Sequence, residues 1–377
     1  MGLVKRLWLI AAVAPSLAIF GQNVALNAPK IAPIPADPLE LVAGPVEVAN
    51  SGTARAAAVE LLDRARTNYA LRSARQAYDL KISFTVNSGG QTEYDGAWQM
   101  EEVYDPQQGI RWTAQAAAGY ATTQISSKDM FYGEGTSSVI PLRLHEARAA
   151  MLGPMPDKKN VDLDLIRTST ANFNGAQLTC VLLSGSGIPG TATPGRRWEE
   201  TEECIDPKSG LLVVHSQAPG RYYAYDYANA PQFSGHTLAR RVTVTEAGKP
   251  VSEIRLESLT EIPPADPSLF VPTESMRSSG PAIAMGGAQK ISKFAGGGPL
   301  TSSMTAQPVC VFGLVTASGQ LVEAHSLQPS DPNSQAAVEA AKQINFAGPA
   351  QLGIRPQQHF VFVIEKFVSG QPAPPEN

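Results

Sequence analysis

The chain has 377 residues, 43% of them hydrophobic and only 17% charged, with 32 glycines and 30 prolines. This length favours two domains. The formal net charge of −4 disfavours nucleic acid as a partner. Low charge together with many turn-forming residues favours an exported, β-rich protein over a helical cytosolic enzyme.

The N-terminus has the layout of a secretory signal peptide, in which Lys5 and Arg6 precede the uncharged apolar run 7–20. That run contains Pro15 and is shorter than the about 20 apolar residues that a membrane-spanning helix needs. We therefore predict a signal peptide at 1–21, its cleavage, and a periplasmic or secreted protein. A short uncleaved anchor is the alternative.

Residues 22–50 are rich in proline and predict an extended tether. From residue 51 the apolar residues fall at helical spacing, and from Tyr78 the period changes to two. The helical positions are Ala57, Leu61, Leu62, Ala65 and Tyr69. The alternating positions are Tyr78, Leu80, Ile82, Phe84 and Val86, then Tyr94, Trp98, Met100 and Tyr104, then Ile110, Trp112 and Ala114.

Three such strands joined by tight turns predict a β-meander. A short helix over 141–151 follows, and strand patterns resume at 168–173, 177–183, 197–205, 211–217, 221–227, 239–246 and 251–261. The fold class predicted for 51–275 is α+β, with a curved antiparallel sheet around a helix.

Cys180 and Cys204 lie on two strand patterns separated by a loop rich in Gly, Pro, Ser and Thr. Strands joined in this way are expected to be antiparallel neighbours, so we predict a disulfide between these cysteines. Cys310 lies in an apolar run and is expected to be a buried free thiol on a strand.

The leading helix, the aromatic meander, the Pro141-Leu-Arg-Leu helix, the Asp206-Pro-Lys-Ser-Gly turn and the closing segment 262–272 together resemble the LolA-like half-barrel proteins. The resemblance implies an incomplete barrel whose apolar concave face holds acyl chains or a lipoprotein. Candidate residues for such a cavity are Ile82, Phe84, Trp98, Met100 and Trp112. An ordinary core between sheet and helix is the alternative interpretation of the same residues.

Residues 276–307 have the Gly- and Ser-rich composition of a linker. Residues 308–370 predict a small β-β-α-β domain, with strands at 309–316, 320–327 and 359–367 and a helix around 336–344. The spacing Val315-x-x-x-Gly319, then a helix, then Phe346-x-x-Pro349 is similar to the TonB C-terminal domain. The resemblance implies docking to an envelope or outer-membrane protein, and we expected 359–367 to be an exposed edge strand that could accept a partner strand.

The sequence contains no Gly-x-Ser-x-Gly, His-Glu-x-x-His or Cys-x-x-Cys motif. Residues 185–190 match the dinucleotide fingerprint literally but do not open a helix, so we interpret them as a hairpin loop. The acidic run Glu199, Glu200, Glu202 and Glu203 predicts a solvated strand face rather than a calcium loop. We therefore expect no catalytic residue, no metal and no cofactor, although a triad assembled only in space stays an alternative.

These features predict an exported non-enzymatic cell-envelope protein that binds a lipid or lipoprotein in a half-barrel and docks to an envelope partner through a TonB-like domain. The alternative is an inner-membrane-anchored, TonB-type energy transducer to an outer-membrane transporter. It requires the run 7–20 to stay in the membrane.

Overall fold

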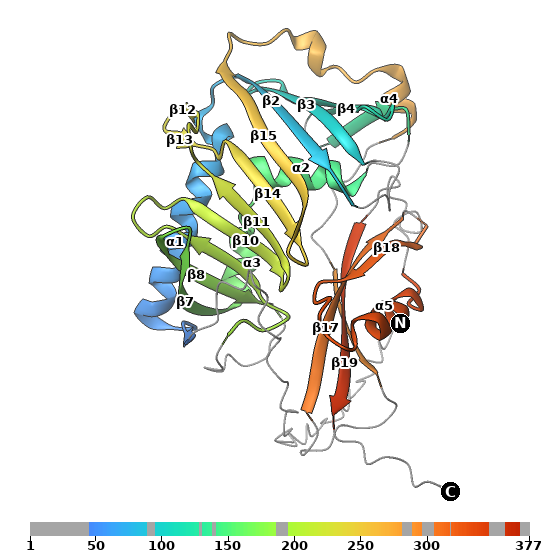
Figure 1. Ribbon diagram of the computed structural model, residues 1–377. Coiled ribbons are helices and arrows are strands. Elements are labelled where there is room, and N and C mark those ends of the chain that lie inside the picture. The colour runs from blue at the N-terminus through green and yellow to red at the C-terminus, as the bar shows by residue number, and fades with distance from the viewer. Residues whose placement is uncertain are drawn as a thin grey trace, which may run out of the picture.

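The computed structural model describes residues 45–88, 95–127, 130–137, 141–185, 195–280, 289–295, 305–316, 318–346 and 359–369. The predicted signal peptide, most of the tether and most of the 185–190 loop lie outside these ranges. The described chain forms a large curved sheet with helices and, beside it, a smaller C-terminal sheet (Figure 1). We call them the main domain and the C-terminal domain.

The main domain is built on a 13-stranded sheet in which every neighbouring pair is antiparallel. Its strand order is β1-β7-β8-β9-β10-β11-β14-β15-β2-β3-β4-β5-β6, so β15 joins the later strands to the predicted meander. The strands are β1 Glu47–Val48, β2 Tyr78–Val86, β3 Gly96–Asp105, β4 Gly109–Ala116, β5 Ala121–Ser127, β6 Met130–Gly135, β7 Leu165–Phe173, β8 Ala176–Ser184, β9 Thr201–Ile205, β10 Leu212–Ala218, β11 Arg221–Asp226, β14 Arg241–Glu246 and β15 Lys249–Glu261. A separate hairpin pairs β12 Gln232–Phe233 with β13 His236–Thr237.

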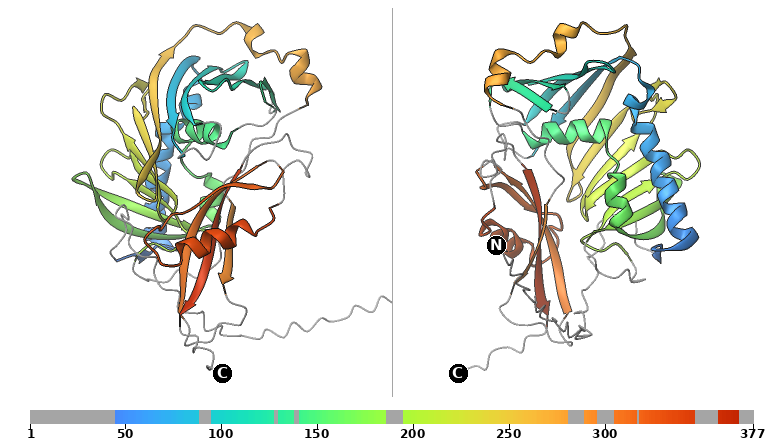
Figure 2. Two further views of the ribbon diagram at one scale, coloured as in Figure 1. Left: turned by 45° about the vertical axis from the view of Figure 1, so that its right-hand side comes forward. Right: turned by 180° about the vertical axis from the view of Figure 1, so that it is seen from behind.

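Two helices share the concave face of this sheet, α1 Gly52–Tyr69 and α2 Leu142–Leu152 (Figure 2). We expected a single helix there. The α1 helix lies along the half that contains β7 and β9, whereas α2 crosses beneath the half that contains β2 to β4. The short α3 helix, Lys158–Leu163, leads from α2 into β7. The buried stripe of α1 is the predicted one except that Ala58 is buried and Ala57 is exposed.

The strand alternation follows directly from the sequence. In β2 every second residue from Tyr78 to Val86 is buried, and the residues between them are partly or fully exposed. A period-two apolar pattern has this result whenever one face of a sheet is covered. The prediction of a large curved antiparallel sheet with few helices is confirmed.

A short arm after β15 covers part of the opposite face of the meander. It contains the 3-10 helix Pro267–Phe270 and α4 Glu274–Ser278, and its Phe270 and Met276 pack against Ile125 of β5.

The C-terminal domain is a four-stranded sheet of order β16-β19-β17-β18 with α5 Ser334–Lys342 packed on one face. The strands are β16 Gln289–Ala295, β17 Thr305–Val315, β18 Leu321–Ser326 and β19 His359–Ser369. The β16 strand runs parallel to β19, and the other pairs are antiparallel.

Two expectations for this region need correction. The segment 276–307, interpreted as a linker from its composition, contains β16 and the first residues of β17. The β16 strand forms because it pairs with β19, and amino-acid composition does not reveal such a pairing. The strand over 359–367, expected at an exposed edge, lies between β16 and β17. The edges of this sheet are therefore β16 and β18.

Among the described residues, no helix combines the length and the apolar character needed to cross a bilayer.

Candidate functional site

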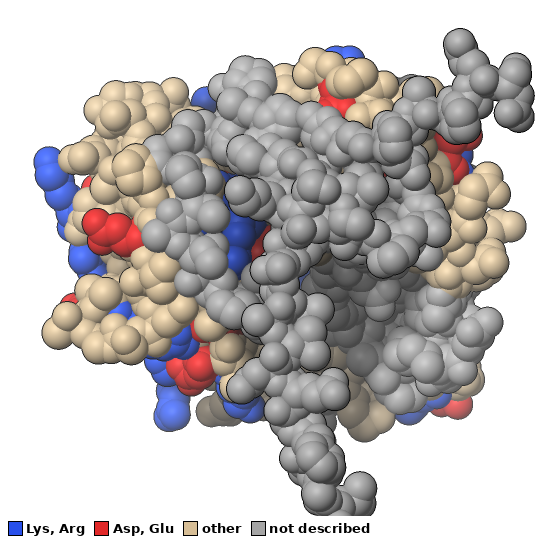
Figure 3. All heavy atoms as spheres, turned by 90° about the horizontal axis from the view of Figure 1, so that it is seen from below, with Lys and Arg blue, Asp and Glu red and all other residues tan. Residues whose placement is uncertain are grey.

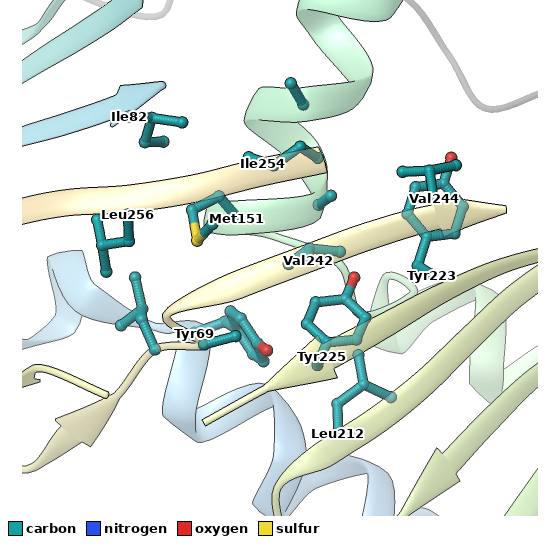
Figure 4. Packing of buried hydrophobic residues seen from close by; sticks show 14 of the residues in the cluster. Tyr69, Ile82, Met151, Leu212, Tyr223, Tyr225, Val242, Val244, Ile254 and Leu256 are labelled. Carbon is teal, nitrogen blue, oxygen red and sulfur yellow. The ribbon is translucent and has the colours of Figure 1, made fainter. Parts of the chain in front are cut away.

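The five residues predicted to line a ligand cavity are brought together on the concave face, and all of them are buried in one core. The rings of Phe84 and Trp98 stack with their centroids 5.3 Å apart. The α2 helix covers Trp112, because the guanidinium of Arg148 lies 5.6 Å from its ring and His145 meets it edge-on. Close by, Met151 of α2 reaches toward Ile82 and Leu256 (Figure 4).

Protein side chains thus fill the space that the prediction gave to a ligand. A ligand on this face would have to displace the apolar side chains of α2, so the role of Ile82, Phe84, Trp98, Met100 and Trp112 in ligand binding stays a prediction. Of the five, Met100 also borders a cavity of about 550 Å³ on the opposite face of the meander. The polar residues around that cavity are Lys81, Gln99, Glu101, Thr113, Gln115, Thr122, Thr123, Glu134 and Thr136.

The predicted disulfide is confirmed. Cys180 of β8 and Cys204 of β9 are direct register partners and are bonded to each other. Glu202 lies beside them, but the two sulfur atoms are used in the disulfide and are not thiolate ligands for a metal. Cys310 on β17 is buried and outside any disulfide, as predicted.

The acidic run is not a solvated strand face. Glu200, Glu202 and Glu203 are buried, and each is paired with a side chain from β7, from the segment before β9 or from β10. The pairs are Glu200 with Arg167 at 2.6 Å, Glu202 with Arg196 at 3.2 Å and Glu203 with His215 at 2.9 Å. The prediction of a strand holds for Glu202 and Glu203, which lie on β9, but Glu199 and Glu200 precede it. The basic partners come from other parts of the chain, so no local pattern predicts them.

A second buried group of charges lies between the two domains, and sequence analysis missed it altogether. We call it the interdomain ion cluster. Its members are Arg143 and Glu146 of α2, Arg221 of β11, Glu246 of β14, and Glu323 and His325 of β18.

Glu246 is the centre of this cluster. Its Oε1 accepts hydrogen bonds from Arg143 Nη1 and from Arg221 Nε, each at 2.8 Å, and its Oε2 lies 3.0 Å from His325 Nε2. Arg143 Nη2 reaches across the domain boundary to Glu323 Oε1 at 3.0 Å. One guanidinium of the main domain therefore holds carboxylates from both domains.

Glu146 completes the arrangement on the main-domain side. It accepts from Arg143 Nη1 at 3.2 Å and is also bonded to Arg221 Nη2 and to the hydroxyl of Tyr223.

An apolar contact surrounds the charges. The guanidinium carbons of Arg143 and Arg221 lie 5.1 and 4.9 Å from the ring centroid of Phe312 on β17, which is fully buried. Desolvated cation–π contacts of this kind contribute about 2 kcal/mol each. The same interface packs Leu142, Ala218 and Trp198 of the main domain against Cys310, Leu314, Leu327, Phe362 and Ile364 of the C-terminal domain.

The surroundings shift the pKa values of the three carboxyl groups in different directions. Burial alone would raise the pKa of Glu246, but Arg143 and Arg221 outweigh it and hold that pKa well below its usual range. Glu146 has a lowered pKa for the same reasons. At Glu323 burial outweighs the attraction of Arg143, and the nearby Glu246 adds to it, so its pKa is raised.

The carboxylates of Glu246 and Glu323 and the imidazole of His325 come close enough together to be considered as metal ligands. Both carboxylates, however, are already held by Arg143, and Arg221 adds a second positive charge beside them. A divalent cation would be repelled by these two guanidinium groups. We therefore interpret the group as an ion-pair network.

A cleft of about 820 Å³ lies next to the cluster, between the end of the β14–β15 hairpin and the edge of the C-terminal domain. It is lined by Asn87, Ser88, Glu246, Ala247, Lys249, Pro250 and Val251 from the main domain and by Ala324, His325, Ser326, Pro329, Ser334, Gln335, Val338 and Lys342 from the C-terminal domain. On the face seen from below, the basic and acidic side chains of the described residues lie in small separate groups (Figure 3).

No protein-family model matches the chain, and no curated protein matches it. Among solved structures, a putative outer membrane lipoprotein-sorting protein domain from Vibrio parahaemolyticus is 10% identical with a TM-score of 0.34, over 56% of this chain and 97% of its own. The LolA superfamily protein NE2245 from Nitrosomonas europaea is 8% identical with a TM-score of 0.35, over 57% and 97%. MucB is 13% identical with a TM-score of 0.26, over 58% and 64%.

At these identities and TM-scores the matches assign the chain to no family. The described structure itself defines a two-domain protein in which a curved antiparallel sheet with helices on its concave face contacts a small α/β domain through a buried ion cluster. The resemblance of the last domain to the TonB C-terminal domain stays a prediction.

Proposed function

We propose that the protein is an exported, non-enzymatic cell-envelope protein that binds an extended segment of an envelope partner along the edge of β18. Export is supported by the charged and apolar layout of residues 1–21 and by the Cys180–Cys204 disulfide, a bond typical of oxidising compartments. Docking is supported by one observation: within the described chain, β18 has a strand neighbour on one side only, and its residues 324–326 line the interdomain cleft.

The register shows which main-chain groups of β18 point into that cleft. Leu327 donates its N–H to the carbonyl of Cys310, which sets the phase of hydrogen bonding with β17. In an antiparallel pair, hydrogen-bonded and non-hydrogen-bonded positions alternate. Ala324, opposite Gly313, and Ser326, opposite Val311, are therefore non-hydrogen-bonded positions whose N–H and C=O groups are directed away from β17.

The walls of the cleft favour a particular partner chemistry. Lys249 contributes positive charge, Lys342 is paired with Glu339, and Val251 and Val338 contribute apolar surface. Glu246 also lines the cleft, but Arg143 and Arg221 neutralise it. We infer that an extended segment with an acidic side chain and a small apolar residue fits best.

Selection from a displayed peptide library on the full chain tests this proposal, with Ala324→Pro as the decisive variant. Proline is tolerated at an edge position whose N–H faces away from the sheet, but it removes a donor that an added strand needs. We expect selected peptides to bind the unmodified protein and to lose at least about tenfold in affinity for Ala324→Pro, the loss of about 1.4 kcal/mol.

Val322→Thr is the matched control, because it changes an exposed side chain of β18 and leaves the main chain intact. It should bind as the unmodified protein does. If Ala324→Pro is folded and binds with unchanged affinity, binding by strand addition is wrong.

We further propose that the concave face binds a lipid or lipoprotein acyl chain after α2 moves aside. The support is the set of large apolar side chains that α2 covers. Native mass spectrometry of the purified protein, and thermal unfolding with lipid analogues, test it: bound lipid, or a higher melting temperature, is expected. If no lipid is carried and no analogue binds, this part of the proposal fails.

Two alternatives are separated by simple measurements. N-terminal sequencing of the exported protein should find a start near residue 22, and an intact N-terminus in the membrane fraction would favour the anchored energy transducer. A screen of hydrolase substrates, repeated with alanine variants of the histidines, tests the absence of enzymatic activity.

A further inference from the structure

The charges of the interdomain ion cluster do not balance by themselves. Two guanidinium groups, of Arg143 and Arg221, face three carboxyl groups, of Glu146, Glu246 and Glu323. Among the described residues, the other titratable groups beside these carboxyls are His325 of β18, Tyr223 of β11, which is bonded to Glu146, and Lys249 at the rim of the cleft. With all three carboxyls ionised and a neutral imidazole, the groups of this cluster that the structure describes carry one net negative charge.

An uncompensated buried charge is costly, because the interior does not solvate it as water does. A single proton removes the imbalance. Glu323 Oε2 offers it a place, because this atom is buried and has no hydrogen-bond partner among the described residues. The Nδ1 atom of His325 lies 3.8 Å from Glu323 Oε1, while Nε2 of the same ring already faces Glu246.

We propose that the cluster is a proton-controlled latch: one proton on Glu323 holds the C-terminal domain on the main domain, and its loss loosens the interface. Glu323 belongs to β18, whereas the charges that its proton balances belong to α2, β11 and β14. Protonation therefore acts on the contact between domains and not on the folding of either one. The inference does not depend on any ligand of the proposed function.

The direction of the pH effect follows from the carboxyl groups. Burial raises the pKa of Glu323, so its contribution to docking is complete at low pH and is lost as the pH rises through its folded-state pKa. Glu246 and Glu146 have lowered pKa values and stay ionised over that range. Docking should be tightest below the folded-state pKa of Glu323 and weaker above it.

Cys310 provides a built-in probe of the interface. Its side chain is 1% exposed and packs in the apolar contact between the domains. A maleimide reagent can reach it only when the interface opens. Its rate of modification in the full-length protein, divided by the rate in the unfolded protein at the same pH, measures the open fraction and cancels the effect of thiol ionisation.

We expect this relative rate to rise as the pH is raised through the folded-state pKa of Glu323, which burial holds above the usual value of a glutamate, with a slope of up to about tenfold per pH unit, the limit for release of one proton. The radius of gyration measured by X-ray scattering should increase over the same range. A relative rate that is flat with pH, or one that rises while the radius of gyration stays constant, would overturn the latch.

Glu323→Gln is the decisive variant, because its neutral amide balances the cluster without a proton. It should show a low relative rate that does not change with pH. Glu339→Gln, on the exposed face of α5 and paired with Lys342, is the matched control and should keep the profile of the unmodified protein. If Glu323→Gln keeps that profile too, a proton on Glu323 does not control docking.

Discussion

The disulfide between Cys180 and Cys204 allows the effect of a single cross-link to be predicted with some precision. The perturbation is the double variant Cys180→Ala/Cys204→Ala. The two cysteines are 24 residues apart in the chain, and for a loop of this length the chain-entropy model predicts a stabilisation of about 3.4 kcal/mol. The β8–β9 pairing extends over neighbouring register partners, so the strands should still pair in the variant.

Urea unfolding followed by tryptophan fluorescence is a suitable assay, because Trp98 and Trp112 are buried in the same domain as the disulfide. We expect the free energy of unfolding to fall by about 3 to 4 kcal/mol. The dependence on urea should become steeper, because an unfolded chain without the cross-link exposes more surface.

Cys310→Ala is the control for the loss of a buried sulfur atom without the loss of a cross-link. It should lower the free energy of unfolding by only about 1 to 2 kcal/mol and leave the urea dependence unchanged. If the double variant loses less than about 1 kcal/mol with an unchanged urea dependence, the disulfide does not constrain the unfolded chain and the entropic reasoning is wrong.

Three further changes probe the ion cluster, the sheet and α2. Arg143→Met leaves Glu323 buried without its guanidinium and leaves Glu246 and Glu146 to share Arg221, and should lower the free energy of unfolding by about 3 to 5 kcal/mol in urea titrations. Gly135→Ala places a methyl group 2.3 Å from a carbonyl oxygen of β5, and should cost about 1 to 3 kcal/mol in the same assay. Burial and a neighbouring guanidinium lower the pKa of His145 to about 4, so the stability supplied by its neutral form should be lost as the pH falls from about 6.5 toward 4; His145→Gln should flatten this part of the profile of melting temperature against pH.

Matched controls accompany these variants. Arg277→Met removes an exposed ion pair and should change stability by less than about 1 kcal/mol. Gly153→Ala adds a methyl group in open space and should change it by less than about 0.5 kcal/mol. The role of Arg143 is contradicted if Arg143→Met is as stable as its control. The close contact at Gly135 is contradicted if Gly135→Ala does not lower the free energy of unfolding. The prediction for His145 is contradicted if His145→Gln leaves the melting temperature between about pH 4 and about pH 6.5 unchanged.

Local patterns in the sequence were enough to predict much of the main domain. The alternation through Phe84, Trp98 and Trp112 predicts three strands with one buried face, because a strand turns successive side chains to opposite faces. The β5 strand gave no such signal, because Thr122, Thr123 and Gln124 are polar, and it forms by pairing with its neighbours.

Local sequence patterns did not predict the surroundings of the charged residues. The sequence pattern predicts that Glu200 and Glu202 face solvent, but both are buried and paired with Arg167 and Arg196. A charge can be buried only where the fold supplies a partner, and that partner can come from any part of the chain. Burial of ionisable groups is therefore the property that sequence patterns predict least well.

The sequence by itself determined the elements whose signal is local: the amphipathic α1, the alternating strands of the meander, and two cysteines on strands that a loop brings side by side. Only the tertiary structure decided what fills the concave face and which charges meet between the domains. The ion cluster joins residues from Arg143 to His325, and no periodicity spans such a distance, because the contact depends on how two separately folded sheets pack.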